Sequence, residues 1–139
     1  MSEKTPKKID HIGIAVKSIE AVLPFYIGSL KLSLVKYEEL VEQGVKIAIL
    51  DVGETKIELM EPLSEDSPVG KFINKRGEGI HHVALGVTNI ERRIEDIKEN
   101  GIKVINEEPV QGTHGAKIAF LHPKSAHGVL FEFCETPNK

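Results

Sequence analysis

Cysteine is almost absent from this sequence, and long apolar or basic runs are missing. Cys134 has no partner for an internal disulfide, which favours a reducing compartment and a cytoplasmic protein, although a secreted protein without disulfides would share this feature. No apolar stretch approaches the roughly 20 residues that span a bilayer, so we expect a soluble, unprocessed protein with no membrane partner. The net charge is −3 and the only basic cluster lies at residues 4–8, which argues against a nucleic-acid partner.

An internal repeat organises the chain. Residues 9–16 recur as residues 80–87, and the segments that follow them, 16–20 and 87–91, align without a gap, so His11 and His82 keep one offset of 71 residues (82 − 11). A chain of 139 residues suits one compact domain. We therefore predict a single domain over 1–139 with three parts: module one over 7–63, a linker over 64–78, and module two over 79–135.

Each module is predicted to have the order βαβββ. In module one, Ser18 can cap a helix whose apolar residues Ile19, Val22, Leu23 and Tyr26 share one face, and Pro24 should shorten or kink that helix. Strands are predicted over 32–40, 45–52 and 56–61, with a hairpin turn over 52–55.

The linker is rich in proline, serine and glycine, and Phe72 and Ile73 suggest one helical turn within it. In module two, Asn89 should cap a helix that ends at Gly101. The strands that follow are predicted near Val104 and over 118–122 and 129–134. The glycine-containing loop 111–116 is either a wide hairpin or a segment whose backbone approaches a ligand.

Strand alternation gives the repeat a chemical meaning. Because successive side chains point to opposite faces, His11 shares a face with small residues, and so does His82. The opposite faces carry branched apolar residues that suit packing under helices. His81 points away from His82 and is expected to be structural, whereas His122 and His127 have no role that we can assign.

Two carboxylates occupy matched positions in the last strand of each module. Glu58 and Glu132 lie among apolar neighbours, where an ionised group is costly unless it is paired or bound to a cation. A single strand histidine is more often a hydrogen-bonded core residue, and a single strand glutamate is usually exposed. The matched positions favour a divalent-metal site of His11, Glu58, His82 and Glu132, a donor set that does not choose among Zn, Co, Mn, Ni and Fe(II).

The chain resembles the vicinal oxygen chelate superfamily and, within it, the methylmalonyl-CoA epimerase family. The similarity runs from end to end, and it is most specific in residues 42–45 and 122–124. Segments 10–16, 58–63, 66–68, 81–83 and 128–132, together with Gly115, also match. The resemblance implies an α+β fold in which two pseudo-symmetric βαβββ modules form a curved, partly open barrel-like sheet.

The same resemblance implies an isomerase that interconverts the (R) and (S) forms of methylmalonyl-CoA. It assigns His11, Glu58, His82 and Glu132 as ligands of one divalent ion per chain, such as Co, Mn, Zn or Ni. It also assigns Glu42 and Glu132 as the acid/base pair, with the pKa of Glu42 tuned by partial burial. Without the resemblance, the sequence around Glu42 predicts an exposed loop residue. Some relatives carry glutamine at the position of Glu58, and the extra negative charge of the glutamate is expected to affect which metal is preferred.

Epimerisation needs a proton to leave one face of a carbon and return to the other, and two opposed bases suffice when a cation stabilises the enolate. No nucleotide or redox cofactor is needed. Thr113, His114, Gly115 and Lys117 are expected to contact the acyl-CoA substrate. The resemblance also implies a homodimer that acts in propionate metabolism and branched-chain amino acid degradation.

Three alternatives stay open on the same fold. The first is a lactoylglutathione lyase of the glyoxalase I type, which also proceeds through an enolised intermediate. The second is a protein that binds a small molecule without transforming it, and such relatives lack the full set of metal ligands. An extradiol dioxygenase requires two histidines, one carboxylate and open positions on iron, so a fourth ligand argues against it.

Overall fold

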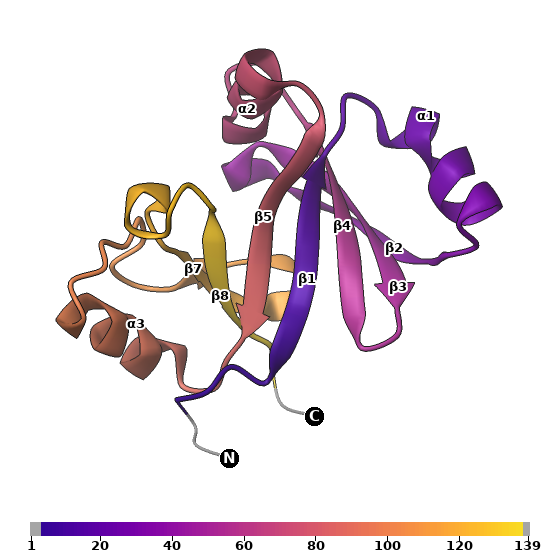
Figure 1. Ribbon diagram of the computed structural model, residues 1–139. Coiled ribbons are helices and arrows are strands. Elements are labelled where there is room, and N and C mark those ends of the chain that lie inside the picture. Colours follow the sequence, from indigo (N-terminus) through magenta and orange to yellow (C-terminus); the bar gives the residue numbers. More distant parts are fainter. Residues whose placement is uncertain (1–3, 138–139) are drawn as a thin grey trace. The chain divides into compact units, whose positions relative to one another are not determined.

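Two compact units make up the computed structural model, which describes residues 4–137 (Figure 1). The N-terminal unit comprises residues 11–81, and the C-terminal unit comprises residues 4–10 and 82–137. The predicted linker therefore belongs with module one, and the first described residues join module two. Across residues 4–137, the helices are too short or too polar to cross a membrane.

The N-terminal unit has the predicted order of elements. They are β1 (Lys8–Ala15), α1 (Ile19–Leu23), η1 (Pro24–Ser29), β2 (Ser33–Leu40), η2 (Val41–Gln43), β3 (Val45–Val52), β4 (Thr55–Pro62) and α2 (Pro68–Arg76). The strand order is β2-β3-β4-β1. Strand β1 runs parallel to β4, and the other neighbours are antiparallel.

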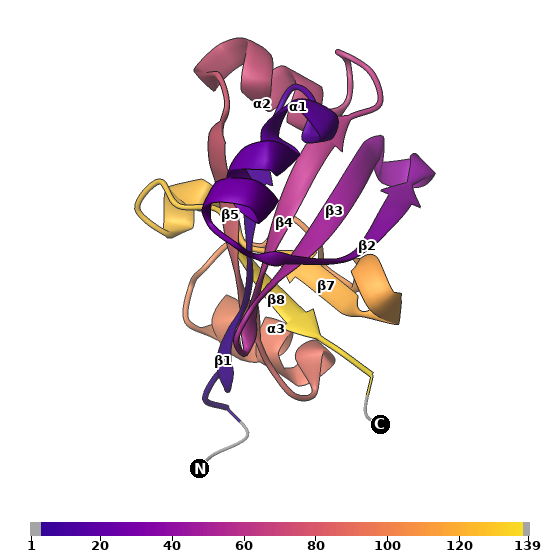
Figure 2. The same ribbon diagram turned by 90° about the vertical axis from the view of Figure 1, so that its right-hand side faces the viewer.

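Helix α1 begins after Ser18 and is short, as the sequence predicts, whereas the predicted apolar residue Tyr26 lies in the segment that follows it. The Ser18 hydroxyl accepts a hydrogen bond from the Ala21 backbone N–H at 3.1 Å, which satisfies one of the free donors of the first turn. The helix has five residues, and at Pro24 the chain changes to the π-helical segment η1. Ile19 packs with Leu50 and Leu59 on one face of the strands, where Figure 2 shows α1 and η1.

Helix α2 covers the opposite face of the same strands. Ser67 caps it and Pro68 occupies its first position, where the missing N–H costs nothing. Val69 packs with Val45, Ile47 and Met60. The predicted single turn is thus a nine-residue helix.

The C-terminal unit repeats this topology. Its elements are β5 (Gly79–Gly86), α3 (Ile90–Glu99), β6 (Val110–Gln111), η3 (Thr113–Gly115), β7 (Lys117–Phe120), η4 (Pro123–Ser125) and β8 (Phe131–Glu135). The strand order β5-β8-β7-β6 matches β1-β4-β3-β2, and β5 is parallel to β8. The first three residues of β5 belong to the N-terminal unit, and the first three residues of β1 belong to the C-terminal unit. Both modules therefore have the order βαβββ.

Two local predictions in module two are wrong. The chain near Val104 forms a single bridge to Leu121 instead of a strand, and the two-residue strand β6 follows later. Asn89 stands at the N-cap of α3, but its backbone is left-handed (φ 54°) and its side chain caps none of the described residues of the helix. The helix is held instead by apolar packing of Ile90 and Ile94 against Phe133, beside β7 and β8 in Figure 1.

Candidate metal and acid–base site

Side-chain alternation on β1 and β5 follows the prediction. His11, Gly13 and Ala15 are buried, whereas the intervening isoleucines are partly exposed. The pattern recurs on β5, where His82 is buried and Val83 is partly exposed. Each histidine therefore lies on the more enclosed face of its strand.

In the N-terminal unit, His11 meets Glu58. The parallel register of β1 and β4 pairs Gly13 with Glu58, so the carboxylate lies beside the residue two positions after the histidine. His11 Nδ1 is 3.5 Å from Glu58 Oε2, and the two residues are only 3% and 5% exposed.

The C-terminal unit repeats the arrangement with His82 and Glu132. Ala84 pairs with Glu132 in the register of β5 and β8, again two positions after the histidine. His82 Nε2 is 2.9 Å from Glu132 Oε1, and the ring of Phe120 meets the His82 imidazole edge-on at 5.4 Å. Glu132 is 2% exposed. The two repeats thus build equivalent imidazole–carboxylate pairs, although opposite ring nitrogens face the carboxylates.

The donor atoms of these pairs fit a divalent cation. A buried ionised carboxylate is costly unless a positive partner compensates it, and each unit holds a buried carboxyl group against an imidazole. Imidazole nitrogen and carboxylate oxygen suit zinc, cobalt, nickel, manganese and iron. The donor atoms of His82 and Glu132 lie close enough together to bind the same metal ion.

Glu42 lies in the N-terminal unit on η2, the short turn that joins β2 to β3. Its side chain is exposed, so the predicted partial burial is wrong. The turn itself is well defined, because the Gly44 N–H donates to the Val41 carbonyl at 3.0 Å. The carboxylate is therefore accessible on a fixed turn.

The predicted substrate residues lie around η3 in the C-terminal unit. Thr113 is buried, whereas His114 and Gly115 are exposed and have left-handed backbones. Lys117 Nζ donates to Glu91 Oε2 at 3.1 Å. Gly115 and Lys117 line an open hollow of about 470 Å³.

A pair of carboxylates that sequence reasoning missed anchors the helices. Glu61 Oε1 accepts from the Ile19 N–H at 2.8 Å, and Glu135 Oε1 accepts from the Ile90 N–H at 2.9 Å. Both glutamates stand three residues after a metal-ligand candidate, Glu58 or Glu132. The repeated Glu-x-x-Glu pattern of residues 58–61 and 132–135 is the signal that could have found them.

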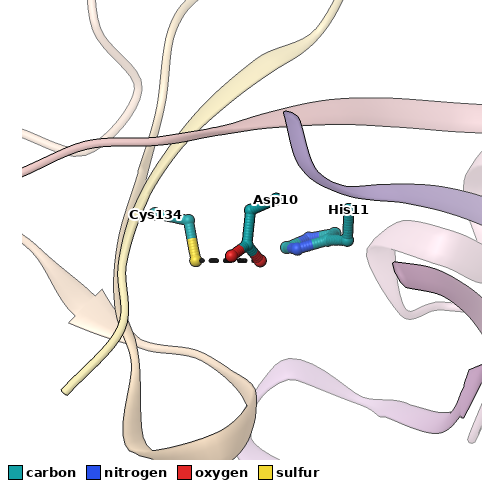
Figure 3. A group of neighbouring side chains, drawn as sticks. All are labelled: Asp10, His11 and Cys134. Carbon is teal, nitrogen blue, oxygen red and sulfur yellow. Dashed lines mark hydrogen bonds between the residues drawn. The ribbon is translucent and has the colours of Figure 1, made fainter. Parts of the chain in front are cut away.

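Neighbouring residues have structural contacts. His81 meets the ring of Phe72 edge-on at 4.9 Å, in agreement with its predicted structural role. His122 Nδ1 accepts from the Lys124 N–H at 3.1 Å and so caps η4. In the C-terminal unit the buried Cys134 thiol donates to Asp10 Oδ2 across 3.6 Å (Figure 3).

Comparison with known proteins identifies the relatives of the chain. Residues 10–120 match the model of the glyoxalase/bleomycin resistance protein/dioxygenase superfamily. Mitochondrial methylmalonyl-CoA epimerase of Homo sapiens is 37% identical over 90% of this chain and 72% of its own length.

Two solved structures are also similar. A hypothetical protein from Bacillus halodurans C-125 is 66% identical, with a TM-score of 0.94 over 95% of this chain and 96% of its own. A variant of Streptomyces coelicolor methylmalonyl-CoA epimerase in complex with 2-nitronate-propionyl-CoA is 40% identical, with a TM-score of 0.92 over the same shares. These matches confirm the predicted α+β fold class. The chain therefore belongs to the glyoxalase/bleomycin resistance protein/dioxygenase superfamily and, within it, to the methylmalonyl-CoA epimerases, which are isomerases.

Proposed function

We propose that this protein interconverts the two epimers of methylmalonyl-CoA by moving a proton at C2, with one divalent metal ion per chain. His11, Glu58, His82 and Glu132 would hold the ion, and Glu42 and Glu132 would act as the acid/base pair. The single observation that carries this proposal is the repetition of a buried imidazole–carboxylate pair, at the same register, in both units.

The repetition is difficult to explain by folding alone. A buried ion pair is weak support for stability, because the desolvation of its charges offsets most of the attraction. Two equivalent pairs in a small chain are therefore expected to serve a ligand. In the proposed arrangement both pairs share one ion, whose two imidazoles and two carboxylates give a nearly neutral centre.

The chemistry requires acid/base groups on opposite faces of C2. One glutamate removes the proton as a carboxylate, and the other returns a proton as a carboxylic acid, so the reaction reverses with the roles exchanged. The ion, when bound, stabilises the negative charge that develops on the thioester oxygen. Glu42 suits the acid/base group that meets C2 from the solvent side, because it is exposed on η2. Glu132 suits the acid/base group on the buried side, because it is buried on β8.

The remaining assignments belong to the same proposal. Thr113, His114, Gly115 and Lys117 would contact the acyl-CoA, a role that the adjacent open hollow of about 470 Å³ supports. In that complex Lys117 would exchange its contact with Glu91 for one with the ligand. A single domain, a homodimeric state and a cytoplasmic location are proposed from the resemblance and from the composition of the chain.

The decisive experiment follows the C2 proton of methylmalonyl-CoA in deuterated water by NMR. The metal-loaded protein should exchange this proton and interconvert the epimers, and a chelator should stop both. His82→Ala should abolish exchange, whereas His127→Ala, at an exposed loop histidine, serves as the matched control. Turnover of methylglyoxal with glutathione in the absence of exchange would identify a lyase instead. A preparation that neither holds metal nor exchanges the proton would identify a binding protein.

A further inference from the structure

The turn that carries Glu42 is bonded to the end of β4. Gly44 follows the turn in a left-handed conformation (φ 69°), and its carbonyl accepts from the Leu63 N–H at 2.9 Å. This bond continues the β3–β4 ladder one step beyond the pairing of Val45 with Pro62. The position of Glu42 is thus linked to the strand that also carries Glu58.

The same glycine packs against the beginning of α2. A Cβ atom built on Gly44 would lie 2.8 Å from the Cβ of Ser67, closer than carbon atoms normally approach. Ser67 cannot easily withdraw, because its hydroxyl donates to the Ser64 carbonyl at 2.7 Å and accepts from the Gly70 N–H at 3.1 Å. It is also buried, with 7% of its surface exposed.

From this contact we infer that Gly44 is a positioning residue for Glu42, because the absence of a side chain at Gly44 lets the turn η2 pack closely against Ser67. The turn η2 lies between the beginning of α2 and the end of β4. The inference rests on the proposed catalytic role of Glu42, and it gives one physical reason why segments 42–45 and 66–68 occur together in this chain. A displacement of about 1 Å at a catalytic group can reduce the rate about 100-fold.

Gly44→Ala tests the contact, and Gly53→Ala is the matched control. Both glycines have a left-handed backbone (φ 69° and 62°), so alanine brings similar backbone strain. No described atom lies within 4 Å of a Cβ at Gly53, in the β3–β4 hairpin, whereas Gly44 faces Ser67. Gly44→Ala should lower kcat at least tenfold beyond Gly53→Ala, with KM and metal affinity within about twofold of the parent.

Removal of the Ser67 side chain should rescue the Gly44 variant. Ser67→Gly alone should lower the unfolding temperature through loss of the helix cap but leave kcat within a few-fold of the parent. In that background Gly44→Ala should cost less than threefold in kcat. A role for Gly44 in stability alone predicts that Gly44→Ala lowers the unfolding temperature and leaves the kcat of the folded protein unchanged, so the loss of kcat and its rescue both report on the position of Glu42.

Gly44→Asn provides a second route if alanine prevents folding. Asparagine tolerates the left-handed conformation but still carries the Cβ that meets Ser67, so it should reproduce the loss of kcat and its rescue. Equal kcat values for the Gly44 and Gly53 variants, or an undiminished loss in the Ser67→Gly background, would overturn the inference. Full activity of Glu42→Gln would instead refute the proposed role of Glu42, so the two failures are distinguishable.

Discussion

The contact between Glu135 and helix α3 predicts a measurable loss of stability. Glu135 lies at the end of β8, and its carboxylate accepts from the Ile90 N–H at 2.9 Å. Because the Asn89 side chain caps none of the described residues of α3, Glu135 supplies the capping interaction from another element. Glu135→Ala should leave this first-turn donor without its carboxylate partner.

The expected magnitude follows from the geometry. Loss of a helix cap costs about 1 kcal/mol and loss of a hydrogen bond to a charged group costs more, so Glu135→Ala should cost about 1–2 kcal/mol. The unfolding temperature should fall by about 5 °C for a domain of this size. Glu61→Ala removes the equivalent bond at Ile19, but Ser18 still caps α1, so its cost should be smaller, about 0.5–1 kcal/mol.

Urea denaturation monitored by circular dichroism tests this difference. Glu135→Gln keeps an oxygen acceptor and should recover more than half of the loss. The reasoning is refuted if Glu135→Ala unfolds at the same urea concentration as the parent, or if the Glu61 variant is the less stable of the two.

Two further predictions concern the site. His82→Ala should lose both the metal and the turnover, whereas Glu42→Ala should keep the metal and lose at least about 100-fold in kcat, as expected for a missing acid/base group. Metal analysis together with the NMR exchange assay tests this prediction, and equal metal loss in the two variants would contradict the assigned roles. The pKa of the Glu91 carboxyl is held below its ordinary value by a hydrogen bond from its own backbone N–H and then by Lys117. Its stabilising contribution is therefore present above the ordinary pKa and is lost as the pH falls through the lowered one. Lys117→Met should raise the pKa of Glu91 part of the way to its ordinary value and weaken this dependence of stability on acid. Carbon-detected NMR titration measures the pKa, and an unchanged value would show that Lys117 does not act on Glu91.

Strand alternation predicted the face on which each histidine lies, and the sequence repeat singled out Glu58 and Glu132, but the pairing of each histidine with the glutamate of its own module follows from the observed strand register. Residues on one face of a strand recur every second position, and a parallel register places Glu58 and Glu132 beside the residues two after His11 and His82. The sequence repeat supplied the second copy. The face that each histidine occupies is set by alternation along one strand, which explains why it was predictable.

Contacts between distant residues were not predictable in the same way. The hydrogen bonds that Glu61 and Glu135 accept join residues that are 42 and 45 positions apart in the sequence. Strand periodicity does not predict which backbone N–H such a side chain reaches. The close contact between Gly44 and Ser67 depends on how the nine-residue helix α2 packs against the strands. The predicted strand near Val104 failed because apolar character there serves packing against α3.

The central claim is that two imidazole–carboxylate pairs hold one divalent ion. Its most direct test is a crystal structure of the metal-loaded protein with anomalous scattering measured at the absorption edge of that metal. The account predicts a single peak per chain, within about 2.0–2.3 Å of donor atoms from His11, Glu58, His82 and Glu132. Separate ions at the two pairs, or strong density elsewhere with these four side chains unliganded, would contradict it.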